Sequence, residues 1–204
     1  MARGLFVSFE GIDRSGKTTQ VRMLAEALGD DAVAVRDPGG TDVGERIRAL
    51  LKDPAATLAP HAEALLFAAA RAELASEVVR PALDDGRVVV ADRFTDSSLA
   101  YQGSGRGLGA EAVARVNDWA CEGLRPDLTI LLELSAHDAA ARSGEEDRFE
   151  AEGAALQERV RLAYDELAAA DPQRWRRIDA ARAPDEVHAE VLPLVRSARA
   201  EVAA

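Results

Sequence analysis

The stretch Gly11-Ile12-Asp13-Arg14-Ser15-Gly16-Lys17-Thr18 matches the pattern of a phosphate-binding loop (P-loop) at every fixed position. An apolar run, Leu5–Glu10, precedes the loop, and Thr18–Leu28 follows it with apolar residues at helical spacing. In such a loop the glycines let backbone N–H groups approach phosphate oxygens, and the helix adds its positive N-terminal end. The strand before the loop and the helix after it make a chance glycine-rich turn the weaker explanation.

The chemistry of the loop follows from its residue types. The charge of Lys17 is suited to the outer phosphates of a nucleotide, and the hydroxyl of Thr18 is suited to Mg²⁺. The residues expected to bind ATP in this segment are Gly11, Ile12, Asp13, Arg14, Ser15, Gly16, Lys17, Thr18 and Thr19. The same loop also occurs in GTPases, ATPase motors and DNA-partitioning ATPases, so the rest of the chain has to select the function.

The pattern along the chain predicts strands that alternate with helices. The expected strands are Leu5–Glu10, Ala32–Arg36, Arg87–Ala91, Leu128–Leu134 and Trp175–Ile178. The expected helices are Thr18–Leu28, Val43–Leu51, Ala62–Val79, Ala110–Cys121, His137–Arg142, Glu152–Ala170 and Asp185–Arg199. This alternation predicts an α/β fold, in which helices cover both faces of a parallel sheet.

No internal repeat, low-complexity linker or domain boundary is visible, so we expect residues 1–204 to form a single domain. The polar stretch Gly144-Glu145-Glu146-Asp147-Arg148 lies between two helical patterns, and we interpret it as a surface loop or a short lid around residues 143–150.

Composition excludes several classes of partner. The formal net charge is −11, which argues against a nucleic-acid partner because that binding needs clustered Lys and Arg. No apolar run approaches the length of a membrane span. Cys121 is the single cysteine, and the N-terminus has no signal-type stretch, so we expect a cytoplasmic location. The three histidines have no metal-ligand spacing.

A second candidate for phosphate chemistry is the pair Asp92-Arg93, which follows the strand Arg87–Ala91. Open parallel sheets bind ligands at the carboxyl ends of their strands. A carboxylate there can hold Mg²⁺ through water, and an arginine offers a fork that fits a phosphate. Taken alone, the pair reads as a solvated ion pair; beside the P-loop, we favour the functional interpretation.

Four blocks together resemble the thymidylate kinase family. They are Phe9-Glu10-Gly11-Ile12-Asp13-Arg14-Ser15-Gly16-Lys17-Thr18-Thr19-Gln20, then Arg36-Asp37-Pro38-Gly39-Gly40-Thr41, then Asp92-Arg93-Phe94 with Ala100-Tyr101-Gln102-Gly103, and finally Asp147-Arg148-Phe149-Glu150. They follow in that family's order and spacing, and the similarity extends from Leu5 to about Ala181. Four ordered blocks are far more specific than any one of them.

The resemblance implies a five-stranded parallel sheet of nucleoside-monophosphate-kinase type and a homodimer. It also implies transfer of the γ-phosphoryl group of ATP to thymidine monophosphate, with Mg²⁺. The catalytic residues that it implies are Asp13, Arg14, Lys17 and Arg93. The acceptor-binding residues are Asp13, Arg48, Phe67, Arg71, Arg93, Ser98, Tyr101 and Gln102. Arg142 aligns with a residue that lies against adenine, and Thr18 and Asp92 are the expected metal ligands.

Some of these assignments depend on the resemblance alone. Phe67 and Arg71 share one face of a helical pattern, and periodicity by itself favours a core residue and a solvated charge. The resemblance instead implies stacking on thymine and a hydrogen bond to its O4 atom. Family members carry a catalytic arginine either in the P-loop or in a longer lid. Arg14 places this chain with the first group, although its second and third blocks look like those of the other group.

Two other functions remain open at this point. One is a kinase of the same fold that acts on another nucleoside monophosphate or on a deoxynucleoside. The other is a nucleotide-binding switch, although the Asn-Lys-x-Asp guanine motif of Ras-like switches does not occur in the chain.

Overall fold

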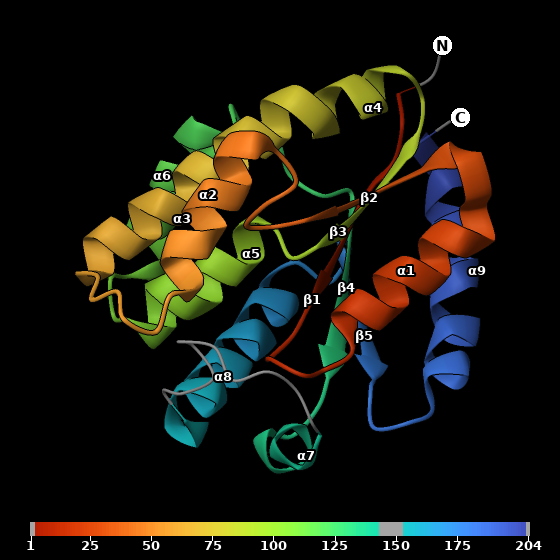
Figure 1. Cartoon of the computed structure of the whole chain (residues 1–204). Coiled ribbons are helices and arrows are strands. Elements are labelled where there is room, and N and C mark those ends of the chain that lie inside the picture. The colour runs from red at the N-terminus through yellow and green to blue at the C-terminus, as the bar shows by residue number, and fades with distance from the viewer. Residues whose placement is uncertain (1–2, 143–152, 203–204) are drawn as a thin grey trace.

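The computed structural model describes residues 3–142 and 153–202, and every strand in these residues joins one sheet. The five strands are parallel and lie in the order β2-β3-β1-β4-β5 (Figure 1). They are β1 (Phe6–Glu10), β2 (Ala32–Arg36), β3 (Val88–Asp92), β4 (Leu128–Glu133) and β5 (Trp175–Asp179). The expected fold class is confirmed.

The strands alternate with helices along the described chain. The α-helices are α1 (Lys17–Leu28), α2 (Asp42–Lys52), α3 (Pro60–Leu74), α4 (Arg80–Asp84), α5 (Thr95–Ser98), α6 (Ala110–Ala120), α7 (Ala136–Ala141), α8 (Ala154–Ala170) and α9 (Pro184–Val202). A 3₁₀ turn, Gly29–Asp31, follows α1. Two π-helical stretches extend α-helices: Ala75–Val79 joins α3 to α4, and Leu99–Gly105 continues α5.

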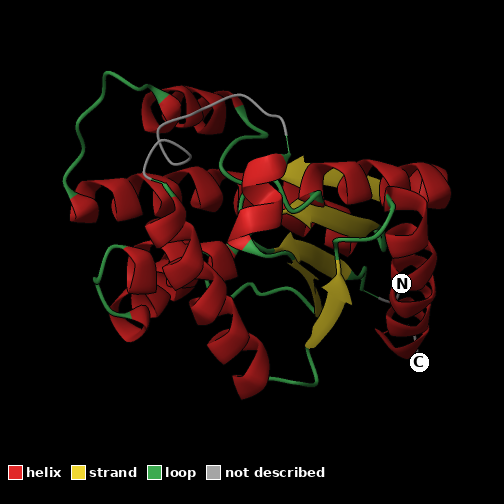
Figure 2. Cartoon of the chain, turned by 90° about the horizontal axis from the view of Figure 1, so that it is seen from below, coloured by secondary structure: helices red, strands yellow, loops and turns green. Residues whose placement is uncertain are grey.

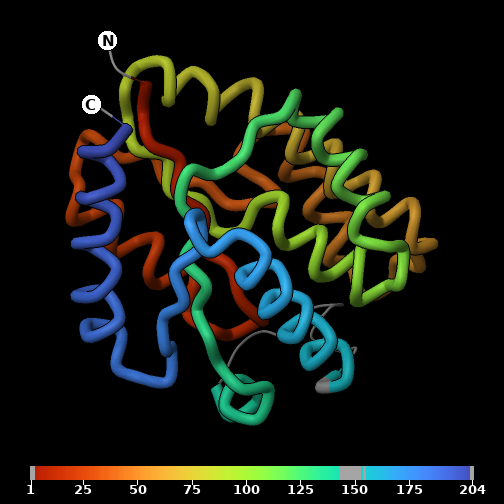
Figure 3. Tube along the Cα trace, turned by 180° about the vertical axis from the view of Figure 1, so that it is seen from behind, coloured from red at the N-terminus to blue at the C-terminus, as the bar shows by residue number. Residues whose placement is uncertain are grey.

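The two faces of β1 belong to two different apolar layers, because successive side chains of a strand point to opposite faces. Val7 and Phe9 pack with residues of α1 and α9, whereas Phe6 packs with residues of α3 and α4. Helix α8 covers β4 and β5 on the same face as α3. Figure 2 shows the strands with helices on both sides, and Figure 3 shows α1 and α9 together on one side of the sheet.

The sequence did not predict a helix over residues 95–105, where the structure has α5 and the π-helical stretch. Two glycines and several polar residues gave this segment low helix propensity. Tertiary packing accounts for the difference. A Cβ atom on Gly103 would lie 3.0 Å from the Cα atom of Ala110, and one on Gly105 would lie 2.9 Å from the side chain of Leu156. The glycines therefore let this segment approach α6 and α8 closely.

Two further expectations need correction or fall outside the structure. The helix predicted over Ala62–Val79 begins earlier, at Pro60, and continues through the π-helical stretch to Asp84. Proline suits the first turn because its missing N–H has no helical partner there. The lid expected around residues 143–150 lies outside the described residues. No helix among the described residues is both long enough and apolar enough to cross a membrane.

Candidate functional site

The candidate site lies where β1 and β3 end side by side. The P-loop follows β1, and Asp92 is the last residue of β3. Two cavities adjoin the loop, one of about 840 Å³ and one of about 470 Å³. Arg14, Lys17 and Thr18 line both cavities. The P-loop is therefore the wall that the two cavities share.

Backbone geometry explains the glycines of the P-loop. Gly11 has φ 139°, and a Cβ atom there would lie 2.6 Å from the backbone oxygen of Leu132, so no larger side chain fits. Gly16, with φ 100°, precedes the first residue of α1. The helix therefore begins directly at Lys17, which places its positive end at the loop.

Lys17 is buried against its own loop. Its Nζ atom donates to the backbone oxygens of Ile12 (2.7 Å) and Gly11 (3.1 Å) and to the hydroxyl of Ser15 (3.3 Å). Burial lowers the pKa of Lys17 to about 8, and the charge of Arg93 contributes in the same direction. The ammonium group thus lies at the mouth of the loop, within the wall common to both cavities.

The two residues expected at a metal lie together. The hydroxyl of Thr18 donates to Oδ2 of Asp92 over 2.5 Å, joining the first turn of α1 to the end of β3. No group of three or more His, Cys, Asp and Glu side chains that could hold a metal occurs within the part of the chain that the structure describes. A hydroxyl beside one carboxylate is a donor set that fits Mg²⁺, which keeps several water ligands and commonly binds phosphates.

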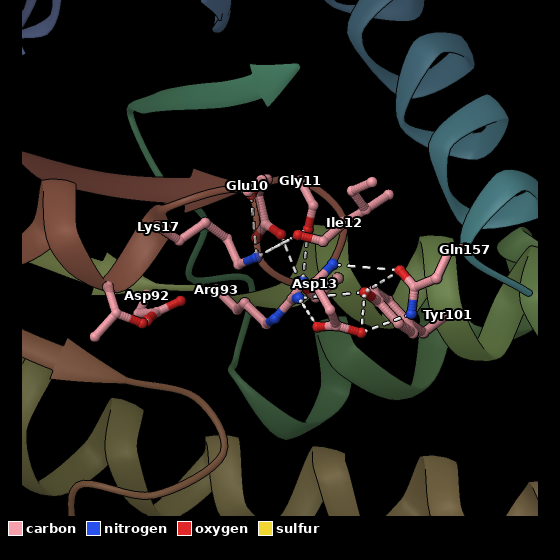
Figure 4. A network of polar contacts seen from close by, with 12 residues as sticks. Glu10, Gly11, Ile12, Asp13, Lys17, Asp92, Arg93, Tyr101 and Gln157 are labelled. Carbon is pink, nitrogen blue, oxygen red and sulfur yellow. Dashed lines mark hydrogen bonds and ion pairs between the residues drawn. The ribbon is translucent and has the colours of Figure 1, made fainter. Parts of the chain in front are cut away.

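Arg93 is the centre of a buried polar network (Figure 4). Its guanidinium pairs with Asp13 (2.6 Å) and donates to the backbone oxygen of Gly11 (3.0 Å) and the hydroxyl of Tyr101 (3.2 Å). Gln157 of α8 donates to the other oxygen of Asp13 (2.7 Å), and the hydroxyl of Tyr101 donates to it as well (3.0 Å). Arg93 follows β3, Asp13 lies in the P-loop and Tyr101 lies in the π-helical stretch Leu99–Gly105. Three separate segments of the chain therefore meet in this network.

The pKa of Asp13 reflects this environment. Burial opposes ionisation of the carboxyl group, but the charges of Arg93 and Lys17 outweigh burial and lower the pKa below its ordinary value. Asp13 is therefore a carboxylate at neutral pH, and it accepts hydrogen bonds rather than donating them.

Glu10 is connected to Arg93 through two shared hydroxyl groups. Its carboxyl group, fully buried at the end of β1, accepts from the hydroxyls of Ser97 (2.5 Å) and Tyr164 (2.8 Å). Both hydroxyls also accept from Nη1 of Arg93. Burial, together with the nearby charge of Asp96, raises the pKa of Glu10 to about 7. The guanidinium of Arg93 thus bonds the ionised carboxylate of Asp13 directly, and it is linked through the hydroxyls of Ser97 and Tyr164 to Glu10, which titrates near neutrality.

The larger cavity continues from Arg93 to Phe67 and Arg71, both on α3. Phe67 is half-buried and lines the cavity rather than one of the core clusters. Arg71 is 1% exposed; it pairs with Asp37 over 2.6 Å and also donates to the side chain of Asn117. An aromatic face and a fixed guanidinium therefore stand together at one end of the cavity.

The remaining predicted acceptor residues also line the larger cavity. Ser98 is 2% exposed, and its hydroxyl has no hydrogen-bond partner among the described residues. Gln102 donates its amide N–H to Glu63 over 3.0 Å. Arg48 of α2 donates to the backbone oxygen of Pro38 over 2.7 Å. The structure thus brings together every acceptor residue that the sequence proposed: Asp13, Arg48, Phe67, Arg71, Arg93, Ser98, Tyr101 and Gln102.

The smaller cavity is lined by Arg142, the residue that the family resemblance aligns with a contact to adenine. Arg142 and Arg14 are linked reciprocally, because each guanidinium donates to the backbone oxygen of the other residue over 3.0–3.1 Å. Arg142 also donates to the backbone oxygen of Ala180 over 2.5 Å. Arg182, which sequence reasoning missed, lines the same cavity. Gly16, Ser15, Thr18 and Thr19 complete its P-loop side.

Sequence reasoning also missed Gln157, Tyr164 and Glu63. Each lies far along the chain from its partner at the site, and no motif or spacing connects them. The sequence placed these residues on predicted helices, but a helical position does not predict which distant residue the side chain contacts.

A P-loop, an Asp-Arg pair at the neighbouring strand end and two cavities that meet at the loop define a P-loop kinase of nucleoside-monophosphate-kinase type. The family model for thymidylate kinase matches residues 9–191. The chain belongs to the thymidylate kinase family, which confirms the resemblance seen in the sequence.

Individual relatives agree with this assignment. The chain is 50% identical to the thymidylate kinase of Pelotomaculum thermopropionicum, covering 93% of this chain and 92% of that protein. It is 45% identical to that of Halothermothrix orenii, covering 93% and 95% respectively. A crystal structure of thymidylate kinase from Ehrlichia chaffeensis matches with a TM-score of 0.79 and 31% identity over 95% of this chain and 99% of that one.

Proposed function

We propose that the chain transfers the γ-phosphoryl group of ATP to thymidine monophosphate and releases ADP and thymidine diphosphate. The observation that carries this proposal is the continuity of the larger cavity. Phe67 and Arg71 line it together with Lys17 and Arg93, so the elements of base recognition and of phosphoryl transfer share one space. The monophosphate lies in this cavity, and ATP enters from the smaller one with its phosphates in the P-loop.

The reaction needs positive charge around the moving phosphoryl group and little covalent chemistry from the protein. Lys17 and Arg14 supply that charge from the P-loop, between the two nucleotides. Arg93 holds the acceptor phosphate, and Asp13 fixes the guanidinium of Arg93 by their 2.6 Å ion pair. An acceptor phosphate is already largely ionised near neutral pH, so orientation by Asp13 matters more than removal of a proton.

The metal proposed for this site is Mg²⁺, held by the hydroxyl of Thr18 and, through water, by Asp92. When bound, the ion would neutralise negative charge on the phosphates of ATP. The two oxygen donors stand in the first turn of α1 and at the end of β3, beside Lys17.

Thymine and deoxyribose are proposed to contact separate walls of the larger cavity. The ring of Phe67 stacks on the base, and Arg71 donates to the O4 atom of thymine. Tyr101 and Ser98 lie on the next wall, where the sugar is placed. The position of Tyr101 is fixed by its contacts with Asp13 and Arg93, so its ring forms a rigid boundary that disfavours a 2′-hydroxyl.

The proposed assembly is a homodimer formed through α3. Ala62, Leu65 and Ala69 are exposed and follow one another at helical spacing, so α3 presents an apolar stripe to solvent. Leu65 is 58% exposed, and Trp119 on the neighbouring helix α6 is 85% exposed. Small residues around a leucine allow two helices to approach closely. We further propose a cytoplasmic location, where ATP is supplied and the thiol of Cys121 stays reduced.

A coupled assay of ADP release tests the activity directly. With ATP and Mg²⁺, the rate is measured for thymidine, deoxyuridine, deoxycytidine, deoxyguanosine and adenosine monophosphates. We expect thymidine monophosphate to give the largest kcat/KM, and Lys17→Ala to remove nearly all turnover while the variant remains folded. If another monophosphate gave a larger kcat/KM, that monophosphate would be the preferred substrate and the proposal would be wrong. ADP release that is slow and independent of every acceptor would indicate a nucleotide switch.

A further inference from the structure

A buried carboxylate next to the larger cavity has no part in the mechanism above. Glu63 lies in the first turn of α3 and is 1% exposed. Its Oε1 atom accepts from the amide nitrogen of Gln102 (3.0 Å) and from Nε of Arg106 (3.0 Å), and its Oε2 atom accepts from Nη2 of Arg106 (3.0 Å). The carboxylate thus links α3 to the π-helical stretch and to the residue that follows it.

The contact with Arg106 fixes the protonation state of Glu63. Two N–H groups of one guanidinium point at the two carboxylate oxygens, which is the parallel two-bond arrangement typical of an ionised pair. The guanidinium of Arg106 carries a permanent positive charge, so this contact favours the ionised carboxylate over the protonated form. Glu63 is therefore an acceptor only, and it can receive only the nitrogen end of a neighbouring amide.

Gln102 is oriented as a consequence. Its amide is planar with nitrogen and oxygen on opposite sides, so the nitrogen that faces Glu63 leaves the oxygen Oε1 on the other side. This side chain lines the larger cavity together with Phe67 and Arg71. Among the contacts of the described residues, no protein donor reaches this oxygen. Gln102 therefore offers an acceptor to the cavity.

Arg71 also lines this cavity, and its guanidinium is held in place by buried polar partners. Unlike Gln102, it offers hydrogen-bond donors. Asp37, which is 3% exposed, pairs with Arg71 over 2.6 Å. Asn117 accepts from Arg71, and its own amide nitrogen donates to the backbone oxygen of Val113 over 2.8 Å. The end of the cavity near Phe67 thus combines a fixed donor with a fixed acceptor. Thymine and uracil carry the complementary pair, an O4 acceptor beside an N3–H donor, whereas cytosine carries an amino donor beside an N3 acceptor.

We propose that Glu63, held ionised by Arg106, is a positioning residue that makes the site select thymine and uracil over cytosine by fixing the amide of Gln102. The inference rests on the proposed function, since it places the base at this end of the cavity. Glu63 does not touch the base; it acts through the amide that does.

The test compares acceptor preferences of Glu63→Gln with those of the unmutated enzyme, using the kcat/KM values for the thymidine, deoxyuridine and deoxycytidine monophosphates. A neutral amide at this position both donates and accepts, so it no longer dictates the orientation of Gln102. We expect the preference for thymidine over deoxycytidine monophosphate to fall by about tenfold, the size of one hydrogen bond. The preference for thymidine over deoxyuridine monophosphate should stay constant, because both bases carry the same O4 and N3–H groups.

A second variant and a double-mutant cycle separate positioning from loss of structure. Arg106→Met removes the guanidinium that contacts both carboxylate oxygens of Glu63, which shifts the balance toward a protonated carboxyl group that can also donate. The same loss of preference is expected there, and this variant carries the test if Glu63→Gln does not fold. In a Gln102→Ala background, Glu63→Gln should no longer change the ratio.

The outcomes are distinct. In both Glu63→Gln and Arg106→Met, kcat/KM could fall by the same factor for all three monophosphates. Glu63 and Arg106 would then only hold the π-helical stretch in place, and the inference would be wrong. The inference is also wrong if Glu63→Gln still changes the ratio in the Gln102→Ala background. If the unmutated enzyme does not phosphorylate thymidine monophosphate, the proposed function fails instead.

Discussion

Arg14 occupies a left-handed backbone position, with φ 62°, in the middle of the P-loop. Few residues other than glycine adopt this conformation without strain, so an arginine there indicates that its side chain has a use. The side chain borders both cavities and donates to the backbone oxygen of Arg142. These contacts support Arg14 as the source of the charge that stabilises the moving phosphoryl group.

We expect Arg14→Ala to lower kcat by about 10³-fold or more while the affinities for ATP and acceptor change little, because the charge acts mainly in the transition state. Steady-state kinetics with both substrates varied provides the measurement. Arg148→Ala, in the segment beyond the described residues, serves as the comparison and should affect kcat less. If Arg148→Ala is the crippled enzyme and Arg14→Ala is nearly normal, the lid supplies the charge.

Glu10 leads to a prediction about pH. Its pKa is about 7 in the folded chain against an ordinary value of 4.5, because burial and the charge of Asp96 oppose ionisation. Between these pH values the folded chain binds more protons than the unfolded chain. The contribution of Glu10 to the free energy of unfolding is therefore complete below pH 4.5 and is lost as the pH rises through 7.

Glu10→Gln keeps the shape of the protonated group and removes its titration. Relative to the unmutated protein, the variant should gain free energy of unfolding, on the order of 1–3 kcal/mol, as the pH rises from 5 to 8. Urea denaturation at several pH values measures this difference. A difference that does not depend on pH would mean that Glu10 does not titrate in this range.

At the level of elements, α8 contacts the P-loop through the side chain of Gln157. Gln157 donates to Asp13 over 2.7 Å and accepts from the backbone N–H of Asp13 over 3.2 Å. Asp13 in turn holds Arg93. The orientation of the acceptor-phosphate arginine thus depends on a helix that contributes no motif of its own.

We expect Gln157→Ala to lower kcat roughly 10- to 100-fold, because a small displacement of Asp13 and Arg93 disturbs the alignment of the phosphates. Glu158→Ala is the matched control, since Glu158 is the next residue of α8 and pairs only with Arg161 at the surface in the contacts that the structure gives it. Its activity should equal that of the unmutated enzyme. Equal kinetics for both variants would show that the α8 contact with the P-loop does not position Asp13.

At the level of the whole molecule, helix α3 contributes both to the proposed dimer interface and to the acceptor cavity. The same helix that exposes Leu65 carries Phe67 and Arg71 on its cavity side.

We expect Leu65→Glu to give a monomer, because two carboxylates facing each other across a symmetric interface repel and remain buried without partners. Light scattering coupled to size-exclusion chromatography measures the mass. Leu162→Glu on α8, where the leucine is 48% exposed, is the control and should leave the mass unchanged. A dimer in both variants would exclude α3 as the interface.

The sequence by itself determined the P-loop, the alternation of strands and helices, and the family. These are properties of contiguous residues: the loop forms from the short segment Gly11–Thr18, and each strand or helix has its own periodicity. Asp92 and Arg93 could be proposed because the carboxyl end of a parallel strand has a known relation to a ligand site. The blocks contain the acceptor residues Asp13, Arg93, Tyr101 and Gln102, whereas Arg48, Phe67 and Arg71 lie between blocks and were proposed only through the family resemblance.

The tertiary structure alone decided which side chains orient those residues. Gln157 meets Asp13 from a helix near the other end of the chain, and Glu63 meets Gln102 across two helical elements. The helix over residues 95–105 likewise depends on glycines that pack against α6 and α8. Such contacts join residues far apart in sequence, and no local spacing encodes them. They exist because burial in a common interior requires each polar group to find a partner, and folding determines which partner is near.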